Sequence, residues 1–376
     1  KVGKKSFLNS FDKLYNLIKT NGYDQYRGLI PVNPKGVPMD GGHRVAIAAH
    51  LGIDVETAEF PSDTNFDYEF FNKKRLSELH ADYIAHSYCK LNKYSRLIFL
   101  YPSANSEHDD TIIDWLKEKG DIIYFKKIEL SNEGPVIFNF HAYKGHEWLG
   151  SHENNFEGAR NKALSCFSGA NGLRLIMVST INESDIIEIK NRYRQLFYIG
   201  NHSIHSTDSH EETLRCSRIL LNENSVDFLN RARIKKFNNY IKLVEKLPIE
   251  LKRNNVRPDE VCLEGSGTMA AYGIRDISDI DLLCATPNQN KISNSTPDIE
   301  FNSTDLTLHN KSIDEILHHP KNYFYYKDMK YISMQQLIYF KKKRGTCKDI
   351  EDIKLMTSFV DRKIINEFTI TLRYFY

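Results

Sequence analysis

Asp279 and Asp281 are separated by a single residue in the segment SDIDLLC, within the last third of the 376-residue chain. Apolar neighbours predict a strand here, and residues two apart on a strand point to the same face of a sheet. Two carboxylates this close repel one another unless a divalent cation is shared between them. Mg²⁺ (or Mn²⁺) prefers carboxylate oxygens together with substrate phosphates. We therefore expect the pair to be catalytic and to bind a metal.

A glycine turn precedes this pair. Gly265 and Ser266 follow the predicted strand VCLE and open a short predicted helix, TMAAYG, that ends at Gly273. Backbone N–H groups in such a turn, backed by a helix N-terminus, can hold phosphate groups. Together with a metal-binding pair, the turn suits phosphoryl or nucleotidyl transfer. The alternative is an ordinary turn beside a solvated strand edge, but the order of strand, turn, helix and strand favours the functional interpretation.

This combination resembles the signature of the DNA polymerase β-type nucleotidyltransferase superfamily, in which Gly-Ser after one strand precedes Asp-x-Asp on the next. The resemblance covers the last third of the chain and implies a nucleoside triphosphate or another nucleotide-activated donor. It also implies a third carboxylate on a neighbouring strand. Asp305 in TDLTLHN is the first candidate, and Asp298 and Glu300 in PDIEF are the alternatives. By the same resemblance Lys348 would face the triphosphate; otherwise it is a solvated basic residue at a helix end.

A second group of reactive side chains lies in the middle of the chain. Histidines and acids gather in GNHSIHSTDSHEET, and basic residues lie in the earlier segment HENNFEGARNK. Histidine and carboxylate side chains at short spacing can bind a metal or perform acid–base chemistry. A second pocket, suited to an anionic or sugar-phosphate ligand, would be formed by His202, His205, Asp208, His210, Arg160 and Lys162. The alternative is structural, because DSHEET also fits an N-cap and the first turn of a helix.

A further phosphate-binding turn is predicted near the N-terminus. The segment PVNPKGVPMDGGHRVAIAAHLG carries Asp40, two glycines, His43 and Arg44. The glycines would allow close backbone approach to a phosphate, and Arg44 could bind it through two N–H groups. The segment resembles the ParB/sulfiredoxin-like fold, in which a D-G-x-H-R turn opens a helix and binds phosphate. The resemblance implies phosphate or nucleotide binding by His43 and Arg44, and a structural remnant of that fold is the alternative.

The elements that would position these residues form three predicted domains: a small ParB-like domain at 1–61, an α/β domain with a largely parallel sheet at 62–247, and a nucleotidyltransferase-like domain with a mixed sheet and helices at 248–376. Within the middle domain, apolar runs predict strands at 96–102, 121–130, 135–143 and 173–180, and periodicity predicts helices at 109–120, 182–197 and 225–247. Alternating strands and helices favour a parallel sheet. The predicted fold class is thus α/β and α+β, in several domains.

Composition and charge restrict the partners and the compartment. The net charge is only +2, and no stripe of Lys and Arg is visible, so nucleic acid is a less suitable partner than a nucleotide and a small acceptor. Six widely spaced cysteines without a C-x-x-C pair predict free thiols in a reducing compartment rather than disulfides or a zinc site. No apolar run approaches the ~20 residues of a membrane span, and no signal-like segment is recognised at the start. We therefore expect a cytoplasmic protein.

The expected function is metal-dependent transfer of a nucleotidyl or phospho-substituent group from a nucleotide donor to a small molecule, a sugar or a surface glycan. The last third is also similar to bacterial surface-glycan phosphotransferase domains of the phosphocholine-transferase type, which implies a place in polysaccharide biosynthesis. Template-independent transfer to RNA or tRNA is one alternative, and it predicts a basic groove beside Asp279 and Asp281 and strongly salt-dependent binding. A non-catalytic nucleotide-binding module is the other.

Overall fold

The computed structural model describes residues 3–24, 28–62, 67–284, 298–301 and 306–373. The chain forms two compact units, Lys1–Leu76 and Ser77–Tyr376. The predicted boundary after residue 61 falls inside the first unit. The predicted boundary after residue 247 falls inside helix α11 (Asn238–Arg253). The second and third predicted segments are thus joined in one compact unit.

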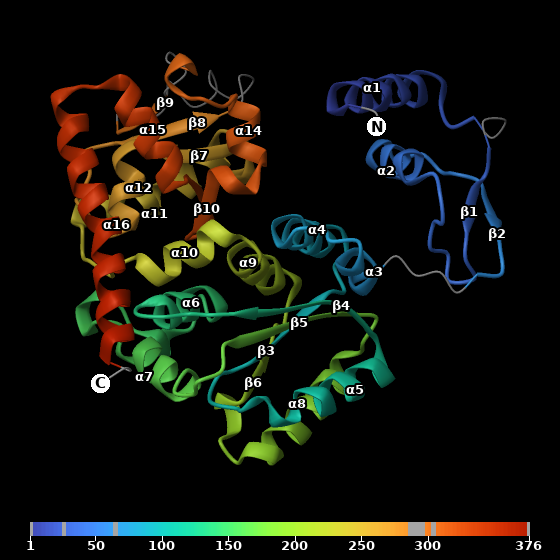
Figure 1. Ribbon diagram of the computed structural model, residues 1–376, viewed down its shortest axis with the longest axis horizontal. Helices are drawn as coiled ribbons and strands as arrows, with labels where there is room; N and C mark the ends of the chain where they lie inside the picture. The colour runs from blue at the N-terminus through green and yellow to red at the C-terminus, as the bar shows by residue number, and fades with distance from the viewer. Residues whose placement is uncertain (1–2, 25–27, 63–66, 285–297, 302–305, 374–376) are drawn as a thin grey trace. The chain divides into compact units, whose positions relative to one another are not determined.

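The first unit combines a two-stranded parallel sheet with helices (Figure 1). Its elements are α1 (Lys4–Asn21), β1 (Ile30–Val32), α2 (Gly42–Leu51), β2 (Thr57–Glu59) and α3 (Tyr68–Lys73). Helix α2 begins after Gly41, which has a left-handed φ of 74°, and ends before Gly52, at 66°. Glycine adopts such angles without steric cost. The turn and helix predicted over residues 40–51 are therefore both present.

A four-stranded antiparallel sheet organises the first half of the second unit. Its strands are β3 (Arg96–Leu100), β4 (Asp121–Ile128), β5 (Leu173–Ser179) and β6 (Ile204–Ser206), in the order β4-β5-β3-β6. Every neighbouring pair is antiparallel. The largely parallel sheet predicted for residues 62–247 is therefore wrong, although three of the four strands predicted there are present.

The correction has a topological cause. Helix α5 (Asp109–Lys119) connects β3 to β4, which run in the same direction, but β5 lies between them. Helix α8 (Glu183–Phe197) likewise connects β5 to β6 across β3. This is the split β–α–β arrangement. Its order of elements along the chain is that of a parallel sheet, so only the long-range pairing distinguishes the two.

Helices cover both faces of this sheet, which explains its continuously apolar strands. Helices α5 and α8 pack over one face, against a cluster that includes Ile98, Leu100 and Ile176. The other face is covered by α4 (Glu78–Leu91), α6 (Gly134–Ala142) and α9 (His210–Leu220) (Figure 1). On that face the rings of Phe99 and Phe138 meet edge to face at 5.5 Å.

Helix α6 replaces the strand predicted at 135–143. Eight of its residues are buried, so the segment has no amphipathic periodicity and cannot be distinguished by pattern from a buried strand. Pro135 stands in its first turn, where its missing N–H is not needed. The predicted long helix at 225–247 is also interrupted, because α10 (Glu223–Arg231) and α11 are separate helices.

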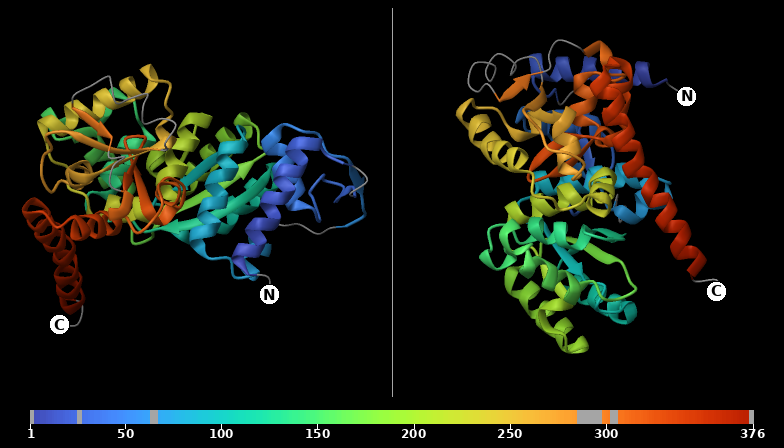
Figure 2. Two further views of the ribbon diagram at one scale, coloured as in Figure 1. Left: turned by 90° about the horizontal axis from the view of Figure 1, so that it is seen from above. Right: turned by 90° about the vertical axis from the view of Figure 1, so that its left-hand side faces the viewer.

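A mixed five-stranded sheet, ordered β10-β11-β7-β8-β9, follows. Its elements are β7 (Val261–Glu264), α12 (Gly265–Ala271), β8 (Ile280–Cys284), β9 (Ile299–Phe301), α14 (Ile313–His318), β10 (Tyr323–Tyr326), β11 (Met329–Ile332), α15 (Met334–Arg344) and α16 (Cys347–Arg373). The expected mixed sheet is present, and the helices α15 and α16 lie on either side of Gly345. Figure 2 shows the last helix extending away from this sheet.

Aromatic packing joins the two sheets of the second unit. The Phe324 ring of β10 stacks on Phe228 of α10 at 4.5 Å and on Tyr331 of β11 at 5.2 Å. All three rings are buried. These aromatic rings form a shared core, which explains why residues 77–376 form a single unit. All six cysteines are free, and only Cys347 is exposed. No helix in the described ranges is long and apolar enough to cross a membrane.

Candidate active site

Two adjacent strands bring carboxylates together at one end of the mixed sheet. Strands β7 and β8 pair antiparallel, with Glu264 opposite Asp281. Directly opposed residues on antiparallel strands share a face and lie close together. Glu264 is fully buried, whereas Asp281 is partly exposed. Asp279 lies two residues earlier, is also partly exposed, and accepts a hydrogen bond of 2.8 Å from the Ser278 hydroxyl.

Gly265 sits directly against this pair. It follows Glu264, has a left-handed φ of 59° and begins α12. A Cβ atom at this position would overlap the Asp281 carboxylate. Ser266 is buried within α12, which has no exposed residue. The structure thus brings Gly265, Asp281 and Glu264 into contact range, and a side chain at position 265 would separate them.

The three candidates for a third carboxylate have different positions. The backbone of Glu300 lies opposite Asp281 in the parallel pairing of β8 with β9. The Asp298 side chain instead faces Lys246, at 3.7 Å. Asp305 lies outside the described residues. Within the described part of the chain, no group of three or more His, Cys, Asp or Glu side chains has an arrangement that could hold a metal.

A buried histidine faces Glu264. The distance from His309 Nε2 to Glu264 Oε2 is 3.2 Å, which is an ion-pair distance without hydrogen-bond geometry. The His309 ring stacks on Phe340 of α15 at 4.8 Å, and both His309 and Glu264 are buried. Sequence reasoning missed this pair. Glu264 could have been noticed as the acid immediately before the glycine turn, but nothing near His309 in the sequence indicates its partner.

Arg344 is the cationic residue beside the carboxylates. Its Nε and Nη2 donate to Asp349 at 2.8 and 2.7 Å. These hydrogen bonds raise the pKa of Arg344, and the negative charges of Asp281 and Glu264 raise it further. The predicted Lys348 is exposed on the first turn of α16. Arg344, which Asp349 holds in place, therefore feels the charge of both carboxylates.

A buried ion network holds the corner that carries Arg344. Lys341, which is 1% exposed, lies between Asp349 and Asp352, at 3.2 and 2.7 Å. Arg275, in the segment between α12 and β8, binds Asp352 through Nε and Nη2 at 2.7 and 2.9 Å. Hydrogen bonds from Arg344, Thr346 and Lys341 outweigh burial and keep the pKa of Asp349 well below its usual range. The network joins α15, α16 and the segment before β8.

The residues predicted for a second pocket are divided by the fold. Lys162, His202, His205 and Asp208 line one cavity. His210 instead contacts the carbonyl of Cys89 in α4, through Nε2 at 2.7 Å, and does not line the cavity. Arg160 pairs with Glu133 at 2.9 Å.

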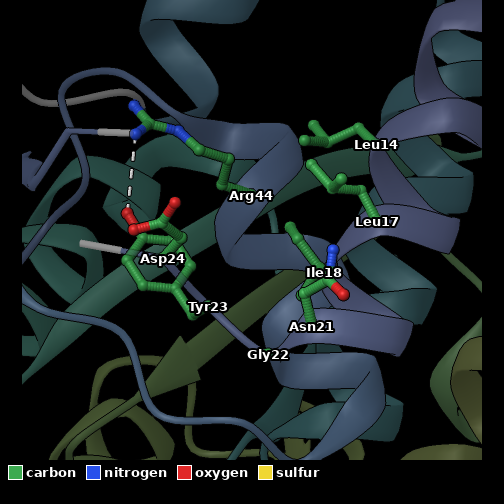
Figure 3. A pocket seen from close by; sticks show the side chains of 8 residues that line it. All are labelled: Leu14, Leu17, Ile18, Asn21, Gly22, Tyr23, Asp24 and Arg44. Carbon is green, nitrogen blue, oxygen red and sulfur yellow. Dashed lines mark hydrogen bonds between the residues drawn. The ribbon is translucent and has the colours of Figure 1, made fainter. Parts of the chain in front are cut away.

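The predicted phosphate-binding turn of the first unit is stabilised internally. Arg44 Nη1 donates to the Gly28 carbonyl at 2.7 Å. It also lies 3.5 Å from the Tyr23 hydroxyl (Figure 3). Arg44 and Tyr23 border a small cavity of 200 Å³ beside α1. The His43 ring packs edge-on against Phe7 and Phe11 of α1, at 5.1 and 5.6 Å. In this structure His43 packs α2 against α1, and phosphate binding by His43 and Arg44 stays a prediction.

Carboxylates, a close glycine and a nearby cation occur together where β7 ends and β8 begins. Comparison of the chain with protein-family models, with curated proteins and with solved structures finds no match. Partly exposed carboxylates beside an arginine can bind a cation and an anionic group at the same time.

Proposed function

We propose that the chain is a metal-dependent transferase that moves a nucleotidyl or phospho-substituent group from a nucleotide donor to a small molecule, a sugar or a surface glycan. The observation that carries the proposal is the β7–β8 pairing, which sets Asp281 opposite Glu264 with Gly265 against the Asp281 carboxylate. Asp279 adds a second partly exposed carboxylate two residues away. Such a group of carboxylate oxygens suits a hard divalent cation and the phosphates that accompany it.

The carboxylates differ in the part that each would take. Asp279 and Asp281 are partly exposed and would hold Mg²⁺ or Mn²⁺, which supplies charge neutralisation to the donor phosphates. Glu264 is fully buried beside His309. We therefore assign Glu264 to positioning the end of β7 rather than to binding the cation. Glu300, opposite Asp281 in backbone register, becomes the preferred third carboxylate among the residues described.

Arg344 would bind the donor phosphates. Asp349 fixes two of its nitrogens, Nε and Nη2, and so fixes the orientation of the guanidinium. The Nη1 group has no partner within the described ranges, and 37% of the side chain is exposed. An oriented guanidinium with one available nitrogen is a preorganised donor for a phosphate oxygen. The low net charge of +2 favours a small acceptor over nucleic acid.

The test is a nucleotide screen with Mg²⁺ or Mn²⁺, first by thermal shift and then by ³¹P NMR of the products. A donor at about 100 times its dissociation constant should stabilise the protein by about 2.7 kcal/mol. Asp279→Asn and Asp281→Asn should each abolish transfer while leaving the fold intact. Asp314→Asn, a change at an exposed carboxylate on α14, is the matched control and should retain wild-type activity.

Two results would count against this function. Full transfer activity in Asp281→Asn would exclude a catalytic role for the carboxylate pair. The absence of a thermal shift with any nucleotide would rule out a nucleotide as the donor. Product formed on an RNA acceptor, with binding that weakens steeply as salt rises, would favour the nucleic-acid alternative. Nucleotide binding without metal dependence or turnover would favour a binding module.

A further inference from the structure

A second cavity lies apart from the carboxylate site. It has a volume of 650 Å³, and its lining residues all fall between positions 142 and 212. Helices α7 (Glu157–Cys166) and α8 border it together with the segment around β6. It shares no residue with the carboxylate site at β7 and β8. Ligand binding in this cavity therefore does not depend on the proposed transferase function.

Three cationic side chains and two carboxylates line the cavity: Lys162, Lys190 and Arg194, with Asp208 and Glu212. Lys190 lies 3.8 Å from Asp208, but neither Lys162 nor Arg194 has a carboxylate partner in the described part of the chain. Lys162 Nζ donates to the Asn201 carbonyl at 2.8 Å. Arg194 Nε is buried and has no hydrogen-bond partner among the described residues. Lys162 and Arg194 both line the cavity and can offer charge-assisted hydrogen bonds to an anionic ligand.

A histidine–carboxylate pair forms another wall. His205 Nε2 lies 2.7 Å from Glu212 Oε1, and the other Glu212 oxygen accepts the Asp208 N–H at 2.8 Å. Burial alone would raise the pKa of Glu212, but the hydrogen bonds from His205 and Asp208 hold it below its usual value. Because Nε2 of His205 faces Glu212, Nδ1 is the ring nitrogen that remains for a ligand. The ring stacks on Phe99 at 5.9 Å, which restricts its rotation.

Aromatic rings complete the cavity. Tyr143 and Trp148 meet edge to face at 5.2 Å, and Trp148 is 44% exposed at the rim. The Tyr143 hydroxyl bonds to that of Tyr101 at 2.8 Å, which holds the ring in place. Lys162 lies over the faces of both tyrosines, at 5.5 and 5.6 Å. A fixed aromatic face beside cations can accept the apolar face of a sugar while the cations bind its charged group.

We propose that this cavity binds a sugar monophosphate. The phosphate would contact Lys162 and Arg194, a sugar hydroxyl would form a hydrogen bond with His205 Nδ1, and the ring would lie against Tyr143 and Trp148. Two cations without carboxylate partners match the dianion of a phosphate monoester better than the single charge of a carboxylate.

The test is isothermal titration calorimetry on the full chain in EDTA, so that a metal-dependent site contributes nothing. Ribose 5-phosphate and glucose 6-phosphate are the probes, with ribose, glucose and gluconate as comparisons. At least one phosphate ester should bind, with affinity that falls as salt rises, and its parent sugar and gluconate should bind at least about tenfold more weakly.

Variants locate the site. Arg194→Gln should weaken binding about tenfold or more, since a charge-assisted hydrogen bond is lost. Arg192→Gln is the matched control on the same helix, because Arg192 lies over Trp115 at 4.0 Å and outside the cavity. Lys162→Gln replaces Arg194→Gln if circular dichroism shows that the latter is unfolded. Asp281→Asn should bind the ester like the wild type. The proposal is overturned if neither ester binds, if gluconate binds as tightly, or if the Arg192 variant loses as much affinity as the Arg194 variant.

Discussion

Gly265 satisfies two constraints that no other residue type satisfies together. Its φ of 59° lies in the left-handed region, where a side chain costs roughly 1–2 kcal/mol. Its Cα also lies so close to Asp281 that a Cβ would overlap the carboxylate. The first constraint shapes the turn from β7 into α12, and the second sets how closely the metal-binding strand can approach that turn. At the scale of a single residue, stability and site geometry therefore depend on the same missing atom.

Replacing Gly265 by alanine should lower the free energy of unfolding by roughly 1–3 kcal/mol and abolish the metal-dependent thermal shift with nucleotide. Urea denaturation and the thermal-shift screen measure the two effects. Gly267→Ala is the matched control two residues later. Its Cβ would meet Leu263 at 3.7 Å, which is ordinary contact, and alanine favours a helix over glycine by about 1 kcal/mol. Equal losses in the two variants would contradict the role given to Gly265.

At the scale of elements, a buried histidine links α4 to α9 over one face of the antiparallel sheet. His86 Nδ1 lies 2.9 Å from the Ser217 hydroxyl, and its Nε2 is buried without a partner in the described part of the chain. Burial, and then the charges of Lys90 and Arg218, lower the pKa of His86 from 6.5 to about 3. Folding therefore favours the neutral ring. The contribution of His86 to stability is complete above pH 6.5 and is lost as the pH falls from 6.5 toward 3.

For His86 alone, this shift predicts that the free energy of unfolding falls by about 2 kcal/mol between pH 7 and pH 5. His86→Gln removes the titrating group, so its unfolding free energy should depend less on pH over that range by the same amount. Chemical denaturation at a series of pH values measures the difference. His80→Gln, at an exposed histidine on the same helix, should follow the wild-type curve. Identical curves for His86→Gln and the wild type would refute the link between pH and the α4–α9 contact.

At the scale of the whole molecule, the two compact units, which meet between Leu76 and Ser77 in the sequence, carry different candidate sites. The carboxylate site and the second cavity both lie in the second unit. The ParB-like turn with His43 and Arg44 lies in the first unit. The second unit has its own core, which joins both of its sheets through Phe228, Phe324 and Tyr331.

A fragment of residues 77–376 should therefore fold alone and unfold in one cooperative transition. It should retain both the nucleotide-dependent thermal shift and the binding of sugar phosphate. Differential scanning calorimetry and titration calorimetry of the fragment and of the full chain make the comparison. A fragment without a cooperative transition would show that the second unit needs the first. A folded fragment that binds no nucleotide would instead assign nucleotide binding to the turn that carries Arg44.

The sequence by itself determined the helix ends and the strand that carries the carboxylate site. Left-handed glycines end α2 and α15, and the predicted strand is present as β8, with Asp281 within it and Asp279 directly before it. These features depend on residues a few positions apart, so a pattern along the chain contains them.

Tertiary structure decided the rest, because it depends on pairing between distant segments. The split β–α–β order cannot be read from alternation, and α6 has no periodicity because it is buried on nearly every side. Glu264, His309 and Arg344 come from three separate segments of the chain, and His309 contacts both Glu264 and Phe340 of α15, the helix that carries Arg344. The second cavity likewise selects Lys162 and His205 but excludes His210, because α9 turns that side chain toward α4. Spacing predicts which face of an element a side chain occupies, but only long-range packing decides what that face meets.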